Sequence, residues 1–105
     1  MKSRFHEAAE AELGEAVTYY DQRAFGLGDR LVAEVKVATR WIEQHPEIAP
    51  VIDRGVRAKV IAHFPYSAMY VIDRDGVFIV AIAHQSKRPA YWADRLPPDR
   101  GDLGS

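Results

Sequence analysis

Seven polar side chains that could act on a phosphodiester fall into two groups along the chain. They are Arg57, Lys59 and His63 in the first group, and His84, Lys87, Arg88 and Tyr91 in the second. Metal-free cleavage needs cations for the oxyanions, a base for the 2′-hydroxyl and an acid for the leaving 5′-oxygen. Histidine, lysine and tyrosine can serve where their pKa values are tuned. If the end of the last strand lies near Lys59 and His63, the two groups converge on one open surface. The alternative is that the charges protect a sheet edge against aggregation, while His84 and Tyr91 pack the end of a strand.

Other standard catalytic sites lack the residues to build them. The chain has no cysteine, which excludes a disulfide framework, cysteine-ligated zinc and thiol catalysis. Its four histidines show no metal-ligand spacing, and no Gly-x-Ser-x-Gly elbow marks a serine nucleophile. Gly26-Leu27-Gly28 lacks the third glycine and the preceding strand of a nucleotide-binding loop. The sequence therefore predicts neither a metal ion nor a cofactor.

Charge is divided unevenly along the chain. The 14 Lys and Arg residues nearly balance the 15 Asp and Glu residues, for a net charge of −1. Acidic residues predominate over positions 6–47, whereas bases are in excess over positions 54–95. This distribution predicts an acidic face and a basic face that can meet a polyanion. Ordinary charge on helix surfaces is the alternative.

Two amphipathic helices are expected in the first half of the chain. Over 6–24, apolar residues recur along one stripe of a 3.6-residue helix, and glutamates occupy its first turns, where the helix dipole favours negative charge. A second such stripe covers 29–44 and ends at His45-Pro46, because the residue before a proline leaves the helical region. The glycine-containing break at 25–28 predicts an antiparallel helical hairpin.

Strands are expected at the start of the chain and throughout its second half. The expected segments are Met1–Phe5, Val56–His63, Ser67–Asp73 and Val77–Gln85. Alternation in the second of them places Arg57, Lys59 and His63 on one face, and Asp75-Gly76 is a hairpin signal. The order β-α-α-β-β-β predicts an α+β domain with a helical hairpin on one face of a mostly antiparallel sheet. The other face is expected to be partly open, because two helices cannot cover both.

The 105 residues are expected to form one domain, since a 48% apolar chain of this length can build a single core. We place the domain at 1–96 and a flexible tail at 97–105, because Pro97-Pro98 precede a Gly- and Asp-rich end. No apolar run approaches the length of a membrane span, and the start lacks the apolar stretch of a signal peptide. We therefore expect a cytoplasmic protein without membrane contact.

Short motifs along almost the whole chain resemble the RelE/ParE superfamily of bacterial toxins. The segments that carry the resemblance lie in Phe5–Tyr20, Gly26–Leu31, Ile42–Pro46, Gly55–Lys59, Phe64–Tyr70 and Val80–Trp92. Each motif is short, but their order and spacing together cover about residues 4–95. The β-α-α-β-β-β fold that the resemblance implies is also the one that periodicity predicts.

The resemblance implies the toxin of a type II toxin–antitoxin system. RelE-like members cleave messenger RNA on the ribosome without a metal, whereas ParE-like members poison DNA gyrase. The motif Arg88-Pro89-x-Tyr91-Trp92 is closer to the ParE-like, plasmid-stabilisation pattern, and a net charge of −1 is low for a protein that sits in ribosomal RNA. We expect a ParE-like toxin that inhibits growth by binding a protein target, with gyrase favoured. The alternatives are a ribosome-dependent endoribonuclease and a degenerate module that retains only antitoxin binding.

The same resemblance implies site residues and a partner. For a ParE-like toxin, the target-binding residues are Arg57, Lys59, Lys87, Arg88, Tyr91 and Trp92. For the ribonuclease alternative, the catalytic residues are Arg57, Lys59, His63, His84, Arg88 and Tyr91. The cognate antitoxin is expected to carry an amino-terminal DNA-binding part, so that the toxin alone contacts little DNA. Its carboxy-terminal half, disordered when free, is expected to bind as a helix in a groove or as an added strand.

Overall fold

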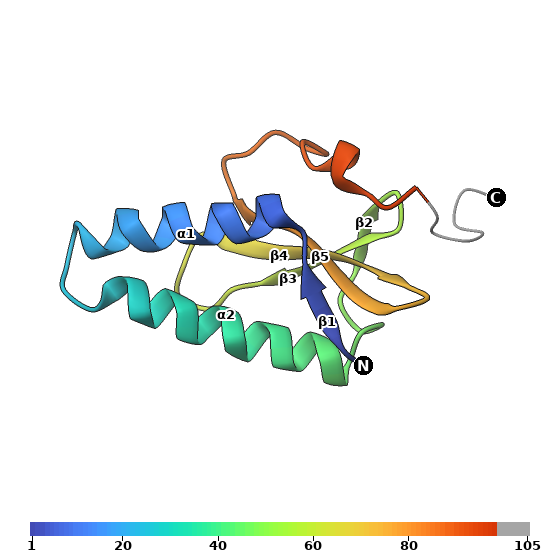
Figure 1. Cartoon of the computed structure of the whole chain (residues 1–105), viewed down its shortest axis with the longest axis horizontal. Helices are drawn as coiled ribbons and strands as arrows, with labels where there is room; N and C mark the ends of the chain where they lie inside the picture. The colour runs from blue at the N-terminus through green and yellow to red at the C-terminus, as the bar shows by residue number, and fades with distance from the viewer. Residues whose placement is uncertain (99–105) are drawn as a thin grey trace.

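The chain folds into two helices packed on a five-stranded sheet (Figure 1). The computed structural model describes residues 1–98, so the expected tail at 97–105 falls largely outside the described residues. The elements are β1 (Ser3–Phe5), α1 (Glu7–Asp21), α2 (Leu27–Gln44), β2 (Val51–Asp53), β3 (Val56–Val60), β4 (Tyr66–Asp73), β5 (Gly76–His84) and the 3-10 turn η1 (Ala93–Arg95). The predicted α+β class and the predicted helical hairpin are confirmed.

The sheet has the order β1-β5-β4-β3-β2, in which β1 runs parallel to β5 and the other neighbours are antiparallel. The β4–β5 hairpin is its longest pairing and extends from Tyr66 opposite His84 to Asp73 opposite Gly76. Gly76 has φ +118°, and a Cβ at this position would lie 2.5 Å from the Lys2 carbonyl oxygen. The turn and the close approach of β1 therefore both require glycine.

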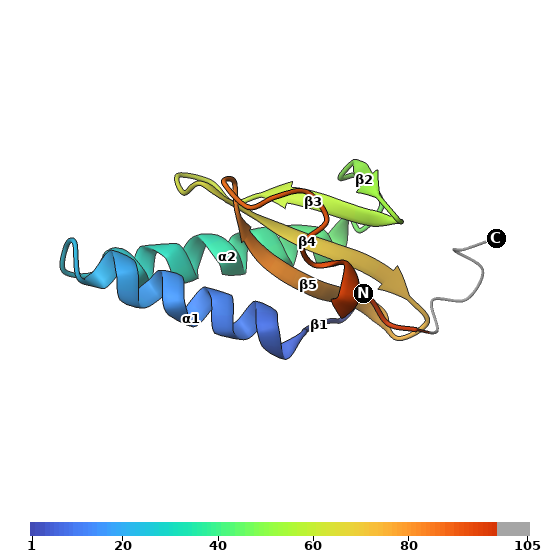
Figure 2. The ribbon, with the colours of Figure 1, turned by 90° about the horizontal axis from the view of Figure 1, so that it is seen from above.

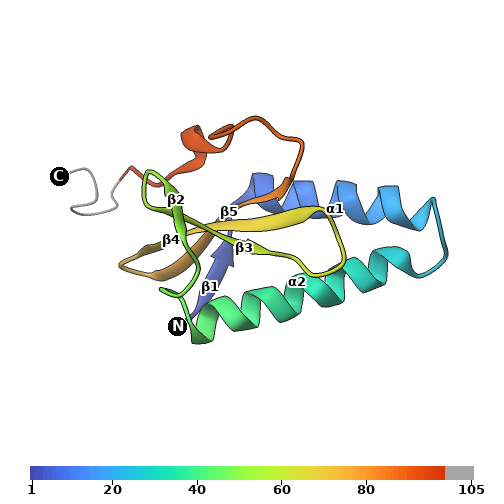
Figure 3. The same cartoon turned by 180° about the vertical axis from the view of Figure 1, so that it is seen from behind.

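The second half of the chain differs from expectation at β2 and β3. β3 ends at Val60 rather than at His63, and His63 lies in the following turn with φ +70°. β2 was not expected. It has only three residues and pairs with β3 through an irregular register, so it leaves no alternating pattern in the sequence. It forms the outer edge of the sheet (Figure 3).

One side-chain hydrogen bond caps the start of the helical hairpin, and another lies at the turn between its two helices. His6 caps α1, with its Nδ1 accepting from the Ala8 N–H at 2.9 Å. α1 ends at Asp21, three residues before the expected boundary, and the Asp21 carboxylate accepts a hydrogen bond from the Gly28 N–H at 2.8 Å. α2 begins two residues earlier than expected, at Leu27. The stripe Leu31, Val35, Ala38 and Ile42 is buried against the sheet, as its spacing predicts.

The face of the sheet away from the helices carries a second apolar core. Val56, Val71, Val80, Ala81 and Ala83 pack there against Trp92, which is 2% exposed. Trp92 belongs to residues 85–96, which we call the strap, and which crosses this face in an irregular path (Figure 2). We expected this face to be partly open, but the strap covers much of it. Neither helix among residues 1–98 is long and apolar enough to cross a membrane.

Candidate functional site

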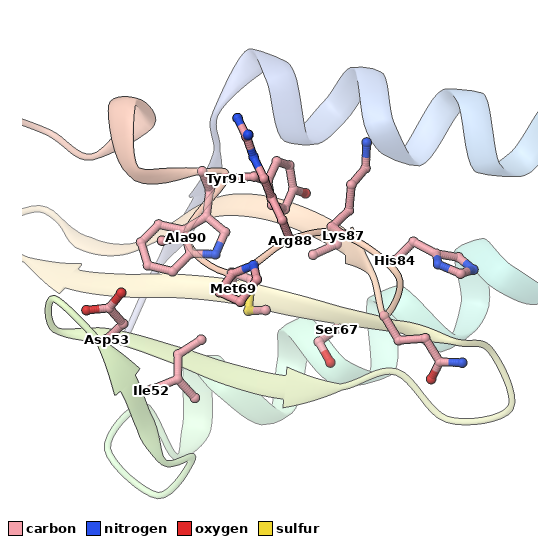
Figure 4. A pocket seen from close by; sticks show the side chains of 13 residues that line it. Ile52, Asp53, Ser67, Met69, His84, Lys87, Arg88, Ala90 and Tyr91 are labelled. Carbon is pink, nitrogen blue, oxygen red and sulfur yellow. The ribbon is translucent and has the colours of Figure 1, made fainter.

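A hollow of about 290 Å³ remains on the strap side of the sheet. Ser67 and Met69 of β4, Ala83 of β5 and Trp92 of the strap contribute to its lining. Figure 4 shows Ile52 and Asp53 approaching it from β2, with the strap residues Lys87, Arg88 and Tyr91 on the opposite side. The hollow therefore lies between the edge of the sheet and the start of the strap.

The hollow combines an apolar lining with two cations, Lys87 and Arg88, which we call the basic rim. Both side chains are exposed, and Figure 4 shows them extending from the strap. The Lys87 ammonium lies 5.3 Å from the centre of the Tyr91 ring, within range of a cation–π contact. Such a surface can hold a partner segment that offers a carboxylate to the rim and an aliphatic side chain to the lining.

Arg57 and Lys59 do not join the basic rim. Arg57 lies opposite Tyr70 in the β3–β4 register, and Tyr70 belongs to the core beneath the helices. The Arg57 guanidinium donates to the carbonyl oxygens of Glu47 (2.8 Å) and Ala49 (2.7 Å). Lys59 extends over the Trp41 ring of α2, with its Nζ 4.2 Å from the ring centre. The two groups therefore do not converge, because alternation along β3 turns Val56 toward the strap and these two cations toward the helix side.

The two histidines of the ribonuclease hypothesis also lie apart. In the turn after β3, His63 Nδ1 lies 2.9 Å from Glu34 Oε2 of α2, which fixes its place on the helix side. His84 ends β5, where its Nδ1 accepts the Ser86 N–H at 3.0 Å and contacts the Ser86 hydroxyl at 2.8 Å. Only His84, Arg88 and Tyr91 of that six-residue set line the hollow.

Tyr91 is held in a polar cluster that the sequence did not indicate. Its hydroxyl donates to Glu12 Oε2 at 2.7 Å, and Arg95 donates to both oxygens of the same carboxylate at 2.9 and 3.0 Å. Burial raises the pKa of Tyr91, and the neighbouring Glu12 carboxylate raises it further. Tyr91 thus keeps its proton at neutral pH. No sequence signal links Glu12 to Arg95, because they are 83 positions apart and follow no shared periodicity.

A second recess lies on the outer surface of the helical hairpin. Two adjoining hollows, of about 310 and 400 Å³, share Phe5, Leu13 and Val32 among their lining residues. We call this surface the hairpin groove; Val17 and Val35 extend it. Thr39 also lines the groove, and its buried hydroxyl has no hydrogen-bond partner among the described residues.

Charged residues of both signs border the hairpin groove. Lys36 and Arg40 of α2 contribute positive charge, while Glu10 and Glu43 contribute negative charge. The hairpin groove is mostly apolar and suits an amphipathic helix.

Among residues 1–98, no three His, Asp or Glu side chains come together to hold a metal ion.

Comparison with known families identifies the chain. Residues 4–89 match the family model described as the ParE toxin of the type II toxin–antitoxin system, parDE. No curated protein matches the chain. The matched span includes both helices, β2 to β5 and the basic rim, but it ends before Tyr91 and Trp92. The chain is a member of the ParE toxin family, the toxins of type II toxin–antitoxin systems.

Proposed function

We propose that this toxin arrests growth by binding a protein target at the hollow, and that DNA gyrase is this target. The proposal is carried by one observation, the joining of an apolar lining to the exposed cations Lys87 and Arg88. Hot spots of protein interfaces combine such buried apolar contacts with charged groups around them. Membership of the ParE family favours gyrase over other proteins.

The positions of the candidate catalytic groups favour binding over RNA cleavage. Arg57, Lys59 and His63 face the helix side, so they cannot act on a phosphodiester held at the hollow. The pKa of Tyr91 is raised by burial and by Glu12, which makes the hydroxyl a poor proton donor at neutral pH. The remaining pair, His84 and Arg88, supplies neither the full set of cations nor a second proton-transfer group.

The test is the supercoiling activity of purified gyrase with the toxin titrated into it. Wild-type toxin should inhibit, and the rim variant Lys87→Glu/Arg88→Glu should need at least about tenfold more protein, since a tenfold change is only about 1.4 kcal/mol of binding. The control Lys2→Glu/Arg30→Glu makes the same charge change at exposed positions outside both recesses and should behave as wild type. Full supercoiling with excess wild-type toxin would exclude gyrase, and equal loss in both double variants would exclude the rim.

Reversal of Arg57 together with Arg88 is a less direct test of the basic rim than reversal of Lys87 and Arg88. The structure shows that Arg57 binds two backbone carbonyl oxygens of the loop before β2, so its reversal would also disturb that loop. If toxicity survives reversal of Lys87 and Arg88, the working surface should be sought on the helical hairpin.

The ribonuclease alternative has its own test. New ends at defined codon positions, found by primer extension on translated messages after toxin induction, would support RNA cleavage. Their absence in cells that still stop growing would support the binding proposal.

We further propose that the cognate antitoxin neutralises the toxin by laying an amphipathic helix in the hairpin groove. The groove offers Leu13, Val17 and Val32 as an apolar surface, and acidic residues on the antitoxin can pair with Lys36 and Arg40. The amino-terminal part of the antitoxin would bind DNA, so that the toxin itself would contact little DNA.

Val32→Asp tests this docking surface, because it places a charge in the middle of the groove. The variant should stay toxic and should no longer be rescued by, or co-purify with, the antitoxin encoded beside it. Val37→Asp is the matched control, since Val37 is exposed on the same helix and does not line the groove. Equal rescue of both variants would contradict this site.

A further inference from the structure

The edge of β5 that faces β1 is covered by that strand over only three of its nine residues. β1 pairs through Ser3–Phe5 with Val77–Ile79, and the chain then turns into α1. Beyond this point two side chains form hydrogen bonds with the backbone groups of β5 that β1 does not reach. The Ile82 N–H donates to Glu12 Oε1 at 3.1 Å, and the Val80 carbonyl accepts from Arg95 Nη1 at 3.1 Å. Glu12 of α1 and Arg95 of η1 therefore take the place of a neighbouring strand.

Irregular pairing at the same place explains why these backbone groups meet side chains. Met69 is paired with Ala81 and Tyr70 with Ile79, so Val80 is an extra residue on β5. Such a bulge turns two successive residues to one face, and Val80 and Ala81 both lie in the core beneath the strap. The bulge thus places the core residues beneath the strap next to the backbone groups that bind Glu12 and Arg95.

The Glu12 carboxylate is fully used as an acceptor. Oε1 accepts from Ile82 N and Arg95 Nη1, and Oε2 accepts from the Tyr91 hydroxyl and Arg95 Nη2. A carboxylate has about four acceptor positions, and all of them are filled here. The side chains of Glu12 and Arg95 are only 16% and 17% exposed, so solvent weakens their pairing far less than that of a surface ion pair.

Three of the four donor atoms belong to the strap: the Tyr91 hydroxyl and the two terminal nitrogens of Arg95. Tyr91 and Arg95 flank the buried Trp92, while Lys87 and Arg88 lie only a few residues before Tyr91. Burial of Trp92 holds the strap to the sheet, but apolar contact has little directional preference. Hydrogen bonds from Tyr91 and Arg95 to one fixed carboxylate supply the direction.

We propose that Glu12 is a positioning residue, whose carboxylate holds Tyr91 and Arg95 and thereby sets the strap so that Lys87 and Arg88 stand at the hollow. The effect of Glu12 on activity rests on the proposed function, because that function makes the basic rim the target-binding surface. The residues that it holds, Tyr91 and Arg95, lie beyond the span matched by the family model. α1 thus lines the hairpin groove through Leu13 and, through Glu12, holds Tyr91, which lines the hollow.

Glu12→Gln tests the proposal with almost no change in shape. Glutamine keeps one oxygen, but its amide nitrogen faces two donors, so about two of the four hydrogen bonds are lost. Glu15→Gln is the matched control, because Glu15 is exposed on the same helix. Both changes are made in a Trp41→Phe background, which leaves Trp92 as the sole tryptophan in the chain.

Three measurements then separate positioning from simple loss of stability. Acrylamide quenching of Trp92 in the folded protein should rise by about threefold or more in Glu12→Gln, since local opening exposes the strap first. It should stay at the parental value in Glu15→Gln and also in Tyr70→Phe, which loses a buried hydrogen bond on the helix side. Gyrase inhibition by Glu12→Gln should weaken by about tenfold, toward that of the rim variant.

The outcomes are distinguishable. Unchanged quenching in Glu12→Gln overturns the positioning role, as does equal quenching in Glu12→Gln and Tyr70→Phe. Increased quenching with full inhibition also overturns it, provided that Lys87→Glu/Arg88→Glu is inactive. If the rim variant remains active, the proposed target-binding surface is wrong, and the quenching comparison alone decides whether Glu12 positions the strap.

Discussion

The two faces of the sheet are covered in different ways. On one face, two regular helices bury continuous stripes, such as Leu31, Val35 and Ile42 of α2. On the other, an irregular strap buries one large side chain, Trp92, and is oriented by hydrogen bonds to Glu12. The helix side is therefore held by many similar contacts, whereas the strap side depends on a few individual residues.

This difference bears on function. The apolar lining of the hairpin groove comes largely from positions that repeat along the two helices. The hollow, in contrast, owes the place of Lys87 and Arg88 to a strap with a single buried anchor. If the hollow has the role proposed above, a substitution outside it, at Glu12, should weaken target binding.

The largest expected effect compares the anchors of the two faces. Trp92→Ala should lower the free energy of unfolding by about 4 kcal/mol and Leu31→Ala by about 3 kcal/mol, because each leaves a cavity in a buried core. Urea unfolding followed by circular dichroism measures both. A loss below about 1 kcal/mol for Trp92→Ala alone would show that the strap is not part of the cooperative fold.

Glycines in the sheet and in the helix layer provide a comparison of opposite sign. Gly76→Ala should destabilise by about 2 kcal/mol, since the new Cβ would meet the Lys2 carbonyl at 2.5 Å and φ is +118°. Gly14→Ala should stabilise by about 1 kcal/mol, because Gly14 lies inside α1 with nothing within 4 Å of the added methyl group. Shifts in melting temperature should have opposite directions. A stabilising effect of Gly76→Ala would contradict the close approach of β1 to the β4–β5 turn, whereas a destabilising effect of Gly14→Ala would contradict the open space beside Gly14.

A single hydrogen bond on the helix side should have a smaller effect. The buried Tyr70 hydroxyl donates to the Pro46 carbonyl at 2.7 Å and ties the loop after α2 to the sheet. Tyr70→Phe should lower the free energy of unfolding by about 1 kcal/mol. Tyr19→Phe changes an exposed residue and should stay within about 0.5 kcal/mol of wild type. Equal effects of the two changes would show that the Tyr70 bond does not stabilise the fold.

The smallest effect concerns an ion pair between β1 and β4. The hydrogen bond from Arg4 holds the pKa of the Asp73 carboxyl below its usual value of 3.8, against the opposing effect of burial. A lowered pKa gives stability that is present above about pH 4 and is lost as the pH falls through the folded-state value. Because the Arg4 side chain is 42% exposed, the contribution should be below about 1 kcal/mol.

Asp73→Asn should remove this part of the acid dependence while leaving the unfolding midpoint near neutral pH only slightly lowered. Urea midpoints measured from about pH 2 to 7 test it. An unchanged acid profile would mean that other carboxylates account for the loss of stability. The Glu12–Arg95 pair has a less exposed arginine, so its contribution to stability should be larger than that of Arg4–Asp73.

The helices, the principal strands and the core beneath the helices could all be predicted from local patterns in the sequence. Each of these features depends on residues close together in the chain: the stripe of α2, the proline after His45 and the Asp75-Gly76 turn. Periodicity of this kind survives in a single sequence because neighbouring residues share one backbone geometry. It was less informative for β2, where three residues in an irregular register carry no periodic signal.

Which charged residues meet depends on tertiary packing and could not be predicted from local patterns. Alternation correctly placed Arg57 and Lys59 together, but could not say that their side of β3 faces the helices rather than the strap. The meeting of Glu12 with Tyr91 and Arg95 brings α1 and the strap together across β5. Such contacts depend on how completed elements pack, and no local pattern records that packing. The strap illustrates this most clearly. Its position follows from the burial of Trp92 and from the hydrogen bonds to Glu12, and the residues that Trp92 and Glu12 contact come together only once the sheet has formed.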